Sequence, residues 1–352
     1  MIKKNQVLDA LREVAHPELK HDLVELGMIQ NVGVQDSRVL VTMALPFLNV
    51  PIKDDLVRAV RDAVSGIDSL AQVEVDLVEM SQRERAAFMN RTQDGSSPAG
   101  PVNDVSHVVA VLSGKGGVGK SSVAALLAVA LRRREMRVGV LDADITGPSI
   151  PMMFGLHRQP GMGPLGILPV ETETGIKVMS INLLLQSEDQ AVIWRGPLIS
   201  NAIKQFWTEV AWGKLDYLVV DLPPGTSDAS LTVMQSIPLS GVVLVTSPQD
   251  LAGMVVRKAA QMAQQLGVPI IGLVENMSYV TCPKCGEQIQ VFGPSRAMQT
   301  AARLSVPLLG QLPLDAELAC RCDKGEVEDY SAKVFDSIVK PLIDRMHVVS
   351  PV

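Results

Sequence analysis

Residues 113–122 have the composition and spacing of a phosphate-binding loop. Gly114, Gly119, Lys120 and Ser121 satisfy the pattern G-x-x-x-x-G-K-[ST], in which glycines let backbone N–H groups approach phosphate oxygens. The Lys120 ammonium would bind the β- and γ-phosphates, and the Ser121 hydroxyl would ligate Mg²⁺. An apolar run precedes the loop and an Ala/Leu-rich run follows it, as a strand and a helix would. We therefore predict a nucleotide site here rather than a glycine-rich connector.

Polar side chains follow three further apolar runs, where the carboxyl ends of parallel strands would meet the loop. Asp221 stands where a Walker B acid ends its strand and holds Mg²⁺ through water. Asp144, with Asp142 as the alternative, could position the attacking water, and Asn276 could pair with a purine edge. The competing interpretation of each is a helix cap or an Asx-turn. The predicted nucleotide-binding set is Gly114, Lys115, Gly116, Gly117, Val118, Gly119, Lys120, Ser121, Ser122, Asp221 and Asn276.

Four cysteines occur in two close pairs, Cys282-x-x-Cys285 and Cys320-x-Cys322. In a chain of 352 residues such spacings are typical of reduced thiols that bind metal, not of a disulfide framework. A 4Fe–4S cluster or a structural zinc needs about four ligands, and one pair supplies two. Three interpretations stay open: two copies of the Cys282/Cys285 pair meeting on a two-fold axis, one site of all four cysteines within a chain, and inert thiols.

The candidate residues need a sheet that brings strand ends together. From residue 107 onward, short Val/Leu/Ile segments alternate with longer helical ones, which predicts right-handed βαβ crossovers. The near-continuous apolar character of these strands indicates that both faces are covered. The predicted fold class is α/β, a P-loop NTPase with a mostly parallel, doubly wound sheet. Its expected strands are residues 107–112, 137–141, 216–220, 241–246, 269–275 and 307–311, and a surface hairpin is expected at 166–180.

Residues 1–80 are predicted to form a separate, small α+β domain. Val39, Val41 and Met43 share one face of an alternating strand. The stretch 81–106 is rich in Gln, Asn, Gly, Ser and Pro and predicts a flexible linker, which leaves 107–352 for the ATPase domain. The elements expected in the small domain are helices at 7–14 and 53–64 and strands within 34–45 and at 73–78.

The composition argues against several classes of protein. Apolar residues make up 47% and charged residues 20%, which is ordinary for a soluble globular chain. Asp and Glu outnumber Lys and Arg by 38 to 32, so the net charge of −6 argues against general nucleic-acid binding. No apolar h-region follows the N-terminus, and the longest apolar stretch, residues 123–131, is far shorter than the roughly 20 residues of a bilayer span. We expect a cytoplasmic protein that binds neither nucleic acid nor a membrane.

The loop resembles the deviant Walker A motif of the MinD-like ATPases, because Lys115 directly follows Gly114. Other segments resemble the Mrp/ApbC iron–sulfur cluster carriers, and the resemblance covers roughly residues 100–345. It implies an ATPase that binds ATP, Mg²⁺ and a 4Fe–4S cluster and delivers the cluster to apo iron–sulfur proteins, with cluster-assembly scaffold proteins as further partners. The segments that carry it are residues 142–151, 194–197, 221–226, 274–278 and 282–286.

The same resemblance implies a homodimer. In the MinD-like group the extra lysine crosses to the partner's nucleotide, so Lys115 would act in trans while Lys120 and Asp144 act in their own subunit. The resemblance also favours a cluster that bridges the cysteine pairs of two subunits. The metal ligands it implies are Ser121 and Asp221 for Mg²⁺ and Cys282 and Cys285 for the cluster.

Two departures from the family pattern qualify the resemblance. Residues 1–80 are similar to a small domain that often precedes this ATPase and recurs in iron–sulfur assembly factors. That domain usually has Asp-Pro-Glu near its start and Cys-Pro in its central loop, where this chain has His16-Pro17-Glu18 and Val50-Pro51. We therefore expect docking from this domain, not cysteine chemistry. The Cys320/Cys322 pair is also outside the family pattern.

Two other functions compete with that of a cluster carrier with slow ATPase activity. A MinD/ParA-like spatial regulator that binds a membrane would end in a basic amphipathic helix, whereas residues 334–346 are mixed in charge and expected to be broken at Pro341. A nucleotide-gated scaffold would dock partners through residues 1–80 and carry no cluster. Of the three functions, we predict the carrier.

Overall fold

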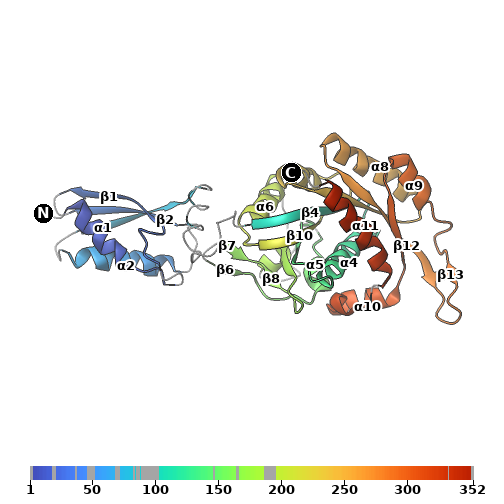
Figure 1. Ribbon diagram of the computed structural model, residues 1–352, viewed down its shortest axis with the longest axis horizontal. Helices are drawn as coiled ribbons and strands as arrows, with labels where there is room; N and C mark the ends of the chain where they lie inside the picture. Colours follow the sequence, from blue (N-terminus) through green and yellow to red (C-terminus); the bar gives the residue numbers. More distant parts are fainter. Residues whose placement is uncertain are drawn as a thin grey trace. The chain divides into compact units, whose positions relative to one another are not determined.

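The protein is described here by a computed structural model (Figure 1). The chain forms two compact units, one built by residues 1–104 with 162–168 and the other by 105–161 with 169–352. The residues that the structure describes are 3–17, 21–35, 38–45, 52–67, 72–81, 84, 88, 103–145, 147–163, 166–185, 196–331 and 333–349. Most of the predicted linker 81–106 therefore lies outside the described residues, as do Thr146, Trp194, Arg195 and the Val50-Pro51 dipeptide.

Among its described residues, the main part of the first unit is a three-stranded sheet that packs with helices α1 and α2. β2 is its central strand and pairs antiparallel with β1 and parallel with β3. Val39, Val41 and Met43 are fully buried, as the alternating pattern predicted, and they pack with Leu56 and Val60 of α2. The elements are α1 (Lys4–Arg12), β1 (Ile29–Gln35), β2 (Arg38–Leu45), α2 (Lys53–Ser65) and β3 (Gln72–Glu79).

β1 was not predicted as a strand of its own. Its sequence, Ile-Gln-Asn-Val-Gly-Val-Gln, has little alternation, so its extended form depends on the ladder to β2 more than on its own apolar pattern. A strand of this kind can be recognised from the sequence only when the strand that pairs with it is known.

The second unit is built on a mostly parallel sheet, as predicted. Its strands run in the order β13-β12-β11-β4-β10-β5-β9-β8, and β14 pairs with β12. Each of the six predicted strands overlaps an observed one, and those predicted at 137–141, 269–275 and 307–311 begin one residue before the observed strand. The strands are β4 (Asn103–Ser113), β5 (Val138–Asp142), β8 (Val170–Glu171), β9 (Lys177–Ser180), β10 (Gly213–Asp221), β11 (Gly241–Thr246), β12 (Ile270–Thr281), β13 (Gln288–Ile289) and β14 (Leu308–Pro313).

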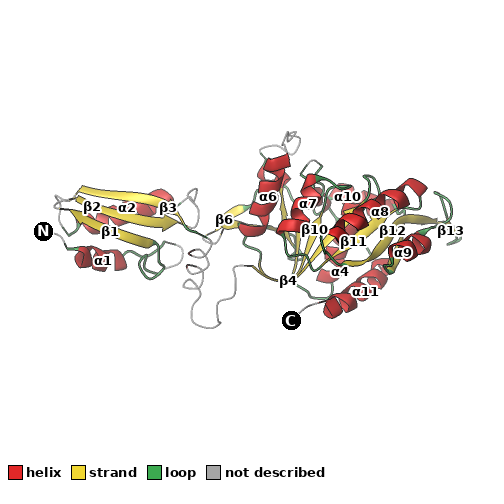
Figure 2. Cartoon of the chain, turned by 90° about the horizontal axis from the view of Figure 1, so that it is seen from above, coloured by secondary structure: helices red, strands yellow, loops and turns green. Residues whose placement is uncertain are grey.

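Helices cover both faces of this sheet, with α4 and α11 on one side and α7 and α8 on the other (Figure 2). α4 carries buried residues on all sides because it packs between the sheet and α11, and this fixes the helix that follows the phosphate-binding loop. The helices are α4 (Lys120–Arg132), α5 (Ile150–Met153), α6 (Gly196–Thr208), α7 (Asp228–Ser236), α8 (Asp250–Gln265), α9 (Ala297–Leu304), α10 (Ala316–Lys324) and α11 (Lys333–Val349), with short 3₁₀ turns η1 (Ile181–Leu184) and η2 (Val327–Asp329).

Two sequence expectations about this unit were wrong. The hairpin expected at 166–180 is present in part, as the antiparallel pair β8–β9, but it does not lie on the surface, because β9 pairs parallel with β5 inside the central sheet and its Val178 and Met179 are fully buried. Only β8 turns back against β9, and β6 (Gly161–Gly163) pairs with β7 (Gly166–Leu168) in a separate two-stranded sheet. In the sequence, the polar Lys177 stands next to the apolar Val178 and Met179, and this pattern does not indicate that both faces of the strand are covered.

The C-terminal helix was also misjudged. α11 continues through Pro341 because Phe335, Ile338, Val339, Leu342 and Met346 pack into the core on one face, and this packing outweighs the hydrogen bond that the proline removes. Within the described part of the chain, no helix has the length and apolar character that crossing a bilayer requires.

Candidate functional site

The phosphate-binding loop lies between β4 and α4 and is shaped by two glycines. Gly119 has a φ of 75°, and a Cβ there would lie 2.2 Å from the Asn276 amide nitrogen. A Cβ on Gly114 would lie 2.4 Å from the backbone of Val255 and Val256 in α8. The loop is therefore packed against β12 and α8, and both positions accept only glycine.

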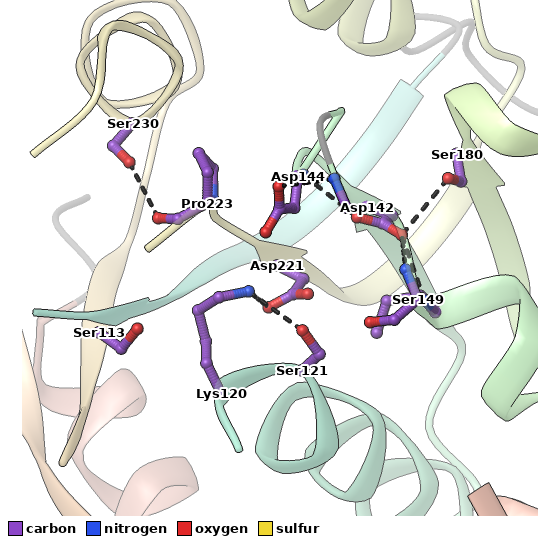
Figure 3. A network of polar contacts seen from close by, with 12 residues as sticks. Ser113, Lys120, Ser121, Asp142, Asp144, Ser149, Ser180, Asp221, Pro223 and Ser230 are labelled. Atoms are coloured by element: carbon purple, nitrogen blue, oxygen red, sulfur yellow. Dashed lines mark hydrogen bonds and ion pairs between the residues drawn. The ribbon is translucent and has the colours of Figure 1, made fainter. Parts of the chain in front are cut away.

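Lys120 lies inside the loop with its ammonium directed at Asp221, at the end of β10 (Figure 3). Nζ is 2.5 Å from Asp221 Oδ1 and donates to the Ser121 hydroxyl at 3.2 Å. Lys120 is 6% exposed and Asp221 is fully buried. The other carboxylate oxygen, Oδ2, is buried and has no hydrogen-bond partner among the described residues, so one acceptor beside Ser121 is left for a ligand.

Asp142, at the end of β5, braces the loop that follows it. Its Oδ2 accepts hydrogen bonds from the backbone N–H of Ser149 at 3.1 Å and of Ile150 at 3.2 Å, and from the Ser180 hydroxyl at 3.3 Å (Figure 3). Its Oδ1 accepts from the backbone N–H of Asp144 at 3.1 Å. Burial, and then the neighbouring Asp221 carboxylate, raise the pKa of Asp142 to about 8. Asp142 thus positions the segment that carries Asp144. From the sequence, the two acids were alternatives for positioning the attacking water.

Asp144 faces the phosphate-binding loop across a cavity of about 240 Å³. It is 9% exposed, and its carboxylate accepts the backbone N–H of Gly147 at 3.2 Å. A cavity of this size, open to solvent beside Lys120, has room for terminal phosphate groups and a water. It is lined by Ser113, Lys115, Gly116, Gly117, Gly119, Lys120, Ser121, Ser122, Asp144, Ser149, Met153 and Pro224.

The donor set fits a hard divalent cation. Asp142, Asp144 and Asp221 are three buried or nearly buried carboxyl groups, and the buried Lys120 ammonium forms an ion pair with Asp221. Burial raises the pKa of Asp221 even though Lys120 acts to lower it, so the site favours additional positive charge. The unpartnered Asp221 Oδ2 and the Ser121 hydroxyl are oxygen donors of the type that Mg²⁺ prefers.

The segment after β10 is tied to the strand that precedes the loop. The Gly225 N–H donates to the Ser113 carbonyl at 2.8 Å, with Gly225 at a φ of 79°. The Ser230 hydroxyl, in the first turn of α7, donates to the Pro223 carbonyl at 3.3 Å. Pro224 lines the cavity, so the segment after β10 contributes to its wall.

Asn276 contacts the phosphate-binding loop itself. It lies within β12, which is longer than predicted, and its Nδ2 donates to the Val118 carbonyl at 3.0 Å. Asn276 is 5% exposed, and its neighbour Met277 has a φ of 58°. The amide donor therefore stabilises the loop, and purine contact stays a prediction. The adjacent Glu275 does not reach the loop but accepts from Ser278 and Gln311.

Lys115 reaches Gln249, directly before α8. Its Nζ donates to Gln249 Oε1 at 2.6 Å. Sequence reasoning missed Gln249, although it lies three residues beyond the end of β11, where the rule about strand ends could have found it. A neutral carboxamide holds the ammonium with one charge-assisted bond and no opposing charge.

Cys282 and Cys285 form a compact knuckle at the far end of β12. β13 returns antiparallel, with Val280 opposite Ile289 and Thr281 opposite Gln288. The turn is closed by the Cys282 N–H donating to the Glu287 carbonyl at 2.8 Å and by the Gly286 N–H donating to the Cys282 carbonyl at 2.9 Å. The backbone N–H of Cys285, then that of Lys284, lower the pKa of the Cys282 thiol because they stabilise its thiolate. Cys285 is exposed and Cys282 half-buried, so both thiols are accessible to a metal.

Cys320 and Cys322 do not complete this site. They lie two residues apart on α10 and so point to different sides of the helix: Cys320 is exposed, whereas Cys322 packs against the core. Burial raises the pKa of the Cys322 thiol. Among the described residues, which include all four cysteines, no three His, Cys, Asp or Glu side chains converge as metal ligands. The alternative of one four-cysteine site within a chain was therefore wrong.

Comparison with known families agrees with this geometry. Residues 104–346 match the ParA family profile, described as the NUBPL iron-transfer P-loop NTPase. The chain belongs to this family. Residues 4–77 match a second profile, that of an iron–sulfur cluster assembly protein. The predicted resemblance is thus confirmed for both parts of the chain.

Two curated relatives match this NUBPL-type NTPase over nearly its whole length. A protein of Synechocystis named iron–sulfur cluster carrier protein is 39% identical over 99% of each chain. The Escherichia coli protein of the same name is 37% identical over 97% of this chain and 90% of its own. A solved nucleotide-binding protein from Archaeoglobus fulgidus, in complex with ADP, is 45% identical, covers 66% of this chain and 91% of its own, and has a TM-score of 0.60. The MinC:MinD complex of Aquifex aeolicus, at 19% identity and a TM-score of 0.51, shows that the MinD-type fold is shared.

Proposed function

We propose that this protein binds and hydrolyses ATP and carries a 4Fe–4S cluster that it transfers to apo-proteins. One observation carries the proposal: a single unit holds both a complete phosphate-binding site and a solvent-facing pair of thiols. The family assignment and the names of the relatives support the same conclusion. The ADP in the related structure supports a nucleotide as the ligand of the loop.

We infer a task for each residue around the phosphates from the contacts described above. Lys120 binds the β- and γ-phosphate oxygens, while Ser121 and Asp221 hold Mg²⁺, which would neutralise phosphate charge when bound. Asp144 orients a water that attacks the γ-phosphorus and accepts its proton. The bond to the β–γ bridging oxygen breaks, ADP leaves with that electron pair, and inorganic phosphate is the second product. Asn276 pairs with the purine through the carboxamide oxygen that the loop does not use.

A homodimer accounts for two features that a single chain does not explain: the role of Lys115 and the supply of only two thiolates by one knuckle. The ammonium of Lys115 is held by the neutral Gln249 and not by an acid, so it can cross to the nucleotide of a second subunit. Each knuckle supplies two thiolates, and a cluster on the two-fold axis would receive four. The cluster is cargo in this proposal, and its exposed position allows its release.

The partners and location follow from the same chemistry. The clients are apo iron–sulfur proteins, and cluster-assembly scaffold proteins supply the cargo. All four cysteines are free thiols, which is typical of the reducing cytoplasm, where we place the protein. The N-terminal unit, which matches an iron–sulfur assembly family, would serve as a docking unit.

Anaerobic reconstitution tests the function directly. The purified chain would be incubated with iron, sulfide and ATP, and its iron content, absorption spectrum and mass in solution measured. We expect a brown dimer with one 4Fe–4S cluster per two chains that passes its cluster to an apo-ferredoxin. A colourless protein that binds ATP normally would instead identify a nucleotide-gated scaffold.

A further inference from the structure

Ser149 stands at the N-cap position of α5, but its side chain does not cap the helix. A serine at this position usually accepts the backbone N–H of the second or third helical residue. The second residue of α5 is Pro151, which has no N–H, and Ser149 forms no side-chain cap bond. By contrast Ser227, the N-cap residue of α7, does accept the Ser230 N–H. The Ser149 hydroxyl is therefore not used by its own helix.

The backbone at Ser149 is held in place by other groups. Asp142 Oδ2 accepts the N–H of Ser149 at 3.1 Å and that of Ile150 at 3.2 Å, and Asp142 is fully buried. Ile150 is also fully buried, in the core that α4 helps to form. These contacts fix the position of Ser149 without its hydroxyl, so the hydroxyl is placed in advance of any ligand.

The hydroxyl belongs to the wall of the nucleotide cavity. Ser149 lines this cavity of about 240 Å³ together with Lys120, Ser121 and Asp144 (Figure 3). Ser149 is half-buried, and within the described part of the chain its hydroxyl has no hydrogen-bond partner. A preplaced donor in this wall, unused by the protein, is available to a ligand of the cavity.

The position of Ser149 in the sheet indicates which phosphate it meets. β5 and β10 are neighbours, and their last residues, Asp142 and Asp221, are paired in register. In a loop of this type the backbone N–H groups hold the α- and β-phosphates and the lysine reaches the β- and γ-phosphates. Because Lys120 extends to Asp221, the terminal phosphate lies toward the ends of these two strands. The segment after β5, which carries Asp144 and Ser149, faces it there.

We propose that the Ser149 hydroxyl donates a hydrogen bond to a γ-phosphate oxygen and so makes the site prefer ATP to ADP. The inference rests on the ATPase function proposed above and names a residue that gives its site this preference. ADP leaves the hydroxyl to water, whereas ATP offers it a charged acceptor, with which a hydrogen bond is stronger. Asp144, which accepts a proton in the proposed hydrolysis, is a carboxylate and cannot be this donor.

Ser149→Ala tests the proposal with two nucleotides. The affinities of the unmodified chain and of the variant for ADP and for the non-hydrolysable analogue AMP-PNP are measured by isothermal titration with MgCl₂ present. We expect the variant to bind AMP-PNP on the order of tenfold more weakly, because one hydrogen bond to a charged group is lost, and its affinity for ADP to change less than about twofold. Ser149→Thr, which keeps a hydroxyl, should bind both nucleotides like the unmodified chain.

Ser240→Ala is the matched control for the loss of a hydroxyl. Ser240 directly precedes β11, at the end of that strand away from the nucleotide cavity, and its hydroxyl accepts the Val108 N–H at 3.1 Å. This control should lower the urea midpoint and leave both nucleotide affinities unchanged, whereas Ser149→Ala should leave the urea midpoint unchanged.

Three results with Ser149→Ala would overturn the proposal: equal weakening of AMP-PNP and ADP, no change for either nucleotide, or a lowered urea midpoint, which would make the hydroxyl a structural group. Failure of the unmodified chain to bind AMP-PNP would instead count against the proposed ATPase function. Because no cluster is needed, a chain that takes up no iron leaves this test intact.

Discussion

The nucleotide site and the cysteine knuckle are built in opposite ways. The nucleotide site is assembled from four strand ends of one chain, its charged groups are buried, and Asp142 and Asn276 hold its loops in place. The knuckle is a five-residue turn at the end of a hairpin, with one exposed and one half-buried thiol. Hydrolysis needs a preorganised and partly dry site, whereas a transferable cargo needs incomplete and accessible ligands.

Removing a thiol ligand from the knuckle should have the largest effect, and it tests directly whether the knuckle and the nucleotide site work independently. Cys282→Ser or Cys285→Ser should abolish cluster retention, because each subunit would then offer one thiolate where two are needed. ATP hydrolysis should change less than about twofold, since neither cysteine lines the nucleotide cavity. Iron content and phosphate release measure the two effects.

The matched control for that experiment is on α10. Cys320→Ser/Cys322→Ser should retain the full iron content, because these side chains point to different sides of the helix and do not converge with the knuckle. Loss of iron in this double variant would contradict the separation of the two cysteine pairs.

The second largest effect should come from the buried ion pair of the nucleotide site. Lys120→Ala should weaken ATP binding roughly hundredfold, because it removes charge-assisted bonds worth about 1.5–3 kcal/mol each. Cluster uptake by the knuckle should persist, and isothermal titration with ATP together with iron analysis would measure both properties.

The same substitution has a consequence for folding. Lys120→Ala leaves Asp221 buried without its ammonium, which typically costs about 3–5 kcal/mol in the free energy of unfolding. Adding Asp221→Asn should restore part of that loss, as urea denaturation would show. A double variant that is less stable than the sum of the single changes would rule out this view of the pair.

A smaller effect is expected at Gln249. Gln249→Glu replaces the neutral partner of Lys115 with a carboxylate, and an exposed ion pair is worth about 0.5–1 kcal/mol. If Lys115 must leave Gln249 to reach the second subunit, ATP-dependent dimerisation should weaken about two- to fivefold, as analytical ultracentrifugation can measure. Gln249→Ala is the control and should not weaken it. If Gln249→Ala weakened dimerisation more than Gln249→Glu did, Gln249 would guide Lys115 to the second subunit and would not retain it.

The smallest effect is expected in a comparison of how the reactivity of Cys282 and that of Cys322 depend on pH. In the cluster-free chain, the pKa of Cys282 is lowered by N–H groups of Cys285 and Lys284, while burial raises that of Cys322. Since the thiolate is the reactive form, the midpoint of alkylation by iodoacetamide should lie at lower pH for Cys282 than for Cys322. Peptide mass spectrometry across a pH series would measure both. Coincident midpoints would mean that the knuckle does not stabilise its thiolate.

The fold and the position of the glycine-rich loop between β4 and α4 were largely predictable because their signals are local. Strands buried on both faces are continuous apolar runs, and the loop pattern specifies glycine where φ is positive or another backbone approaches, as at Gly119 and Gly114. The misjudged elements depend on distant partners. β1 and β9 become strands through ladders to β2 and β5, and α11 passes Pro341 because the core holds its apolar face.

By itself, the sequence determined the chemistry that this protein has available: a phosphate loop, acids at strand ends and two closely spaced thiols. Tertiary structure alone decided how these groups divide their tasks. It placed Asp142 where it holds the following loop by hydrogen bonds, and Asp144 at the cavity. It also directed Lys115 to Gln249 and separated Cys322 from the knuckle. Residue type and spacing describe what a side chain can do, but its neighbours come from segments more than a hundred residues away, and burial among them sets its charge and direction.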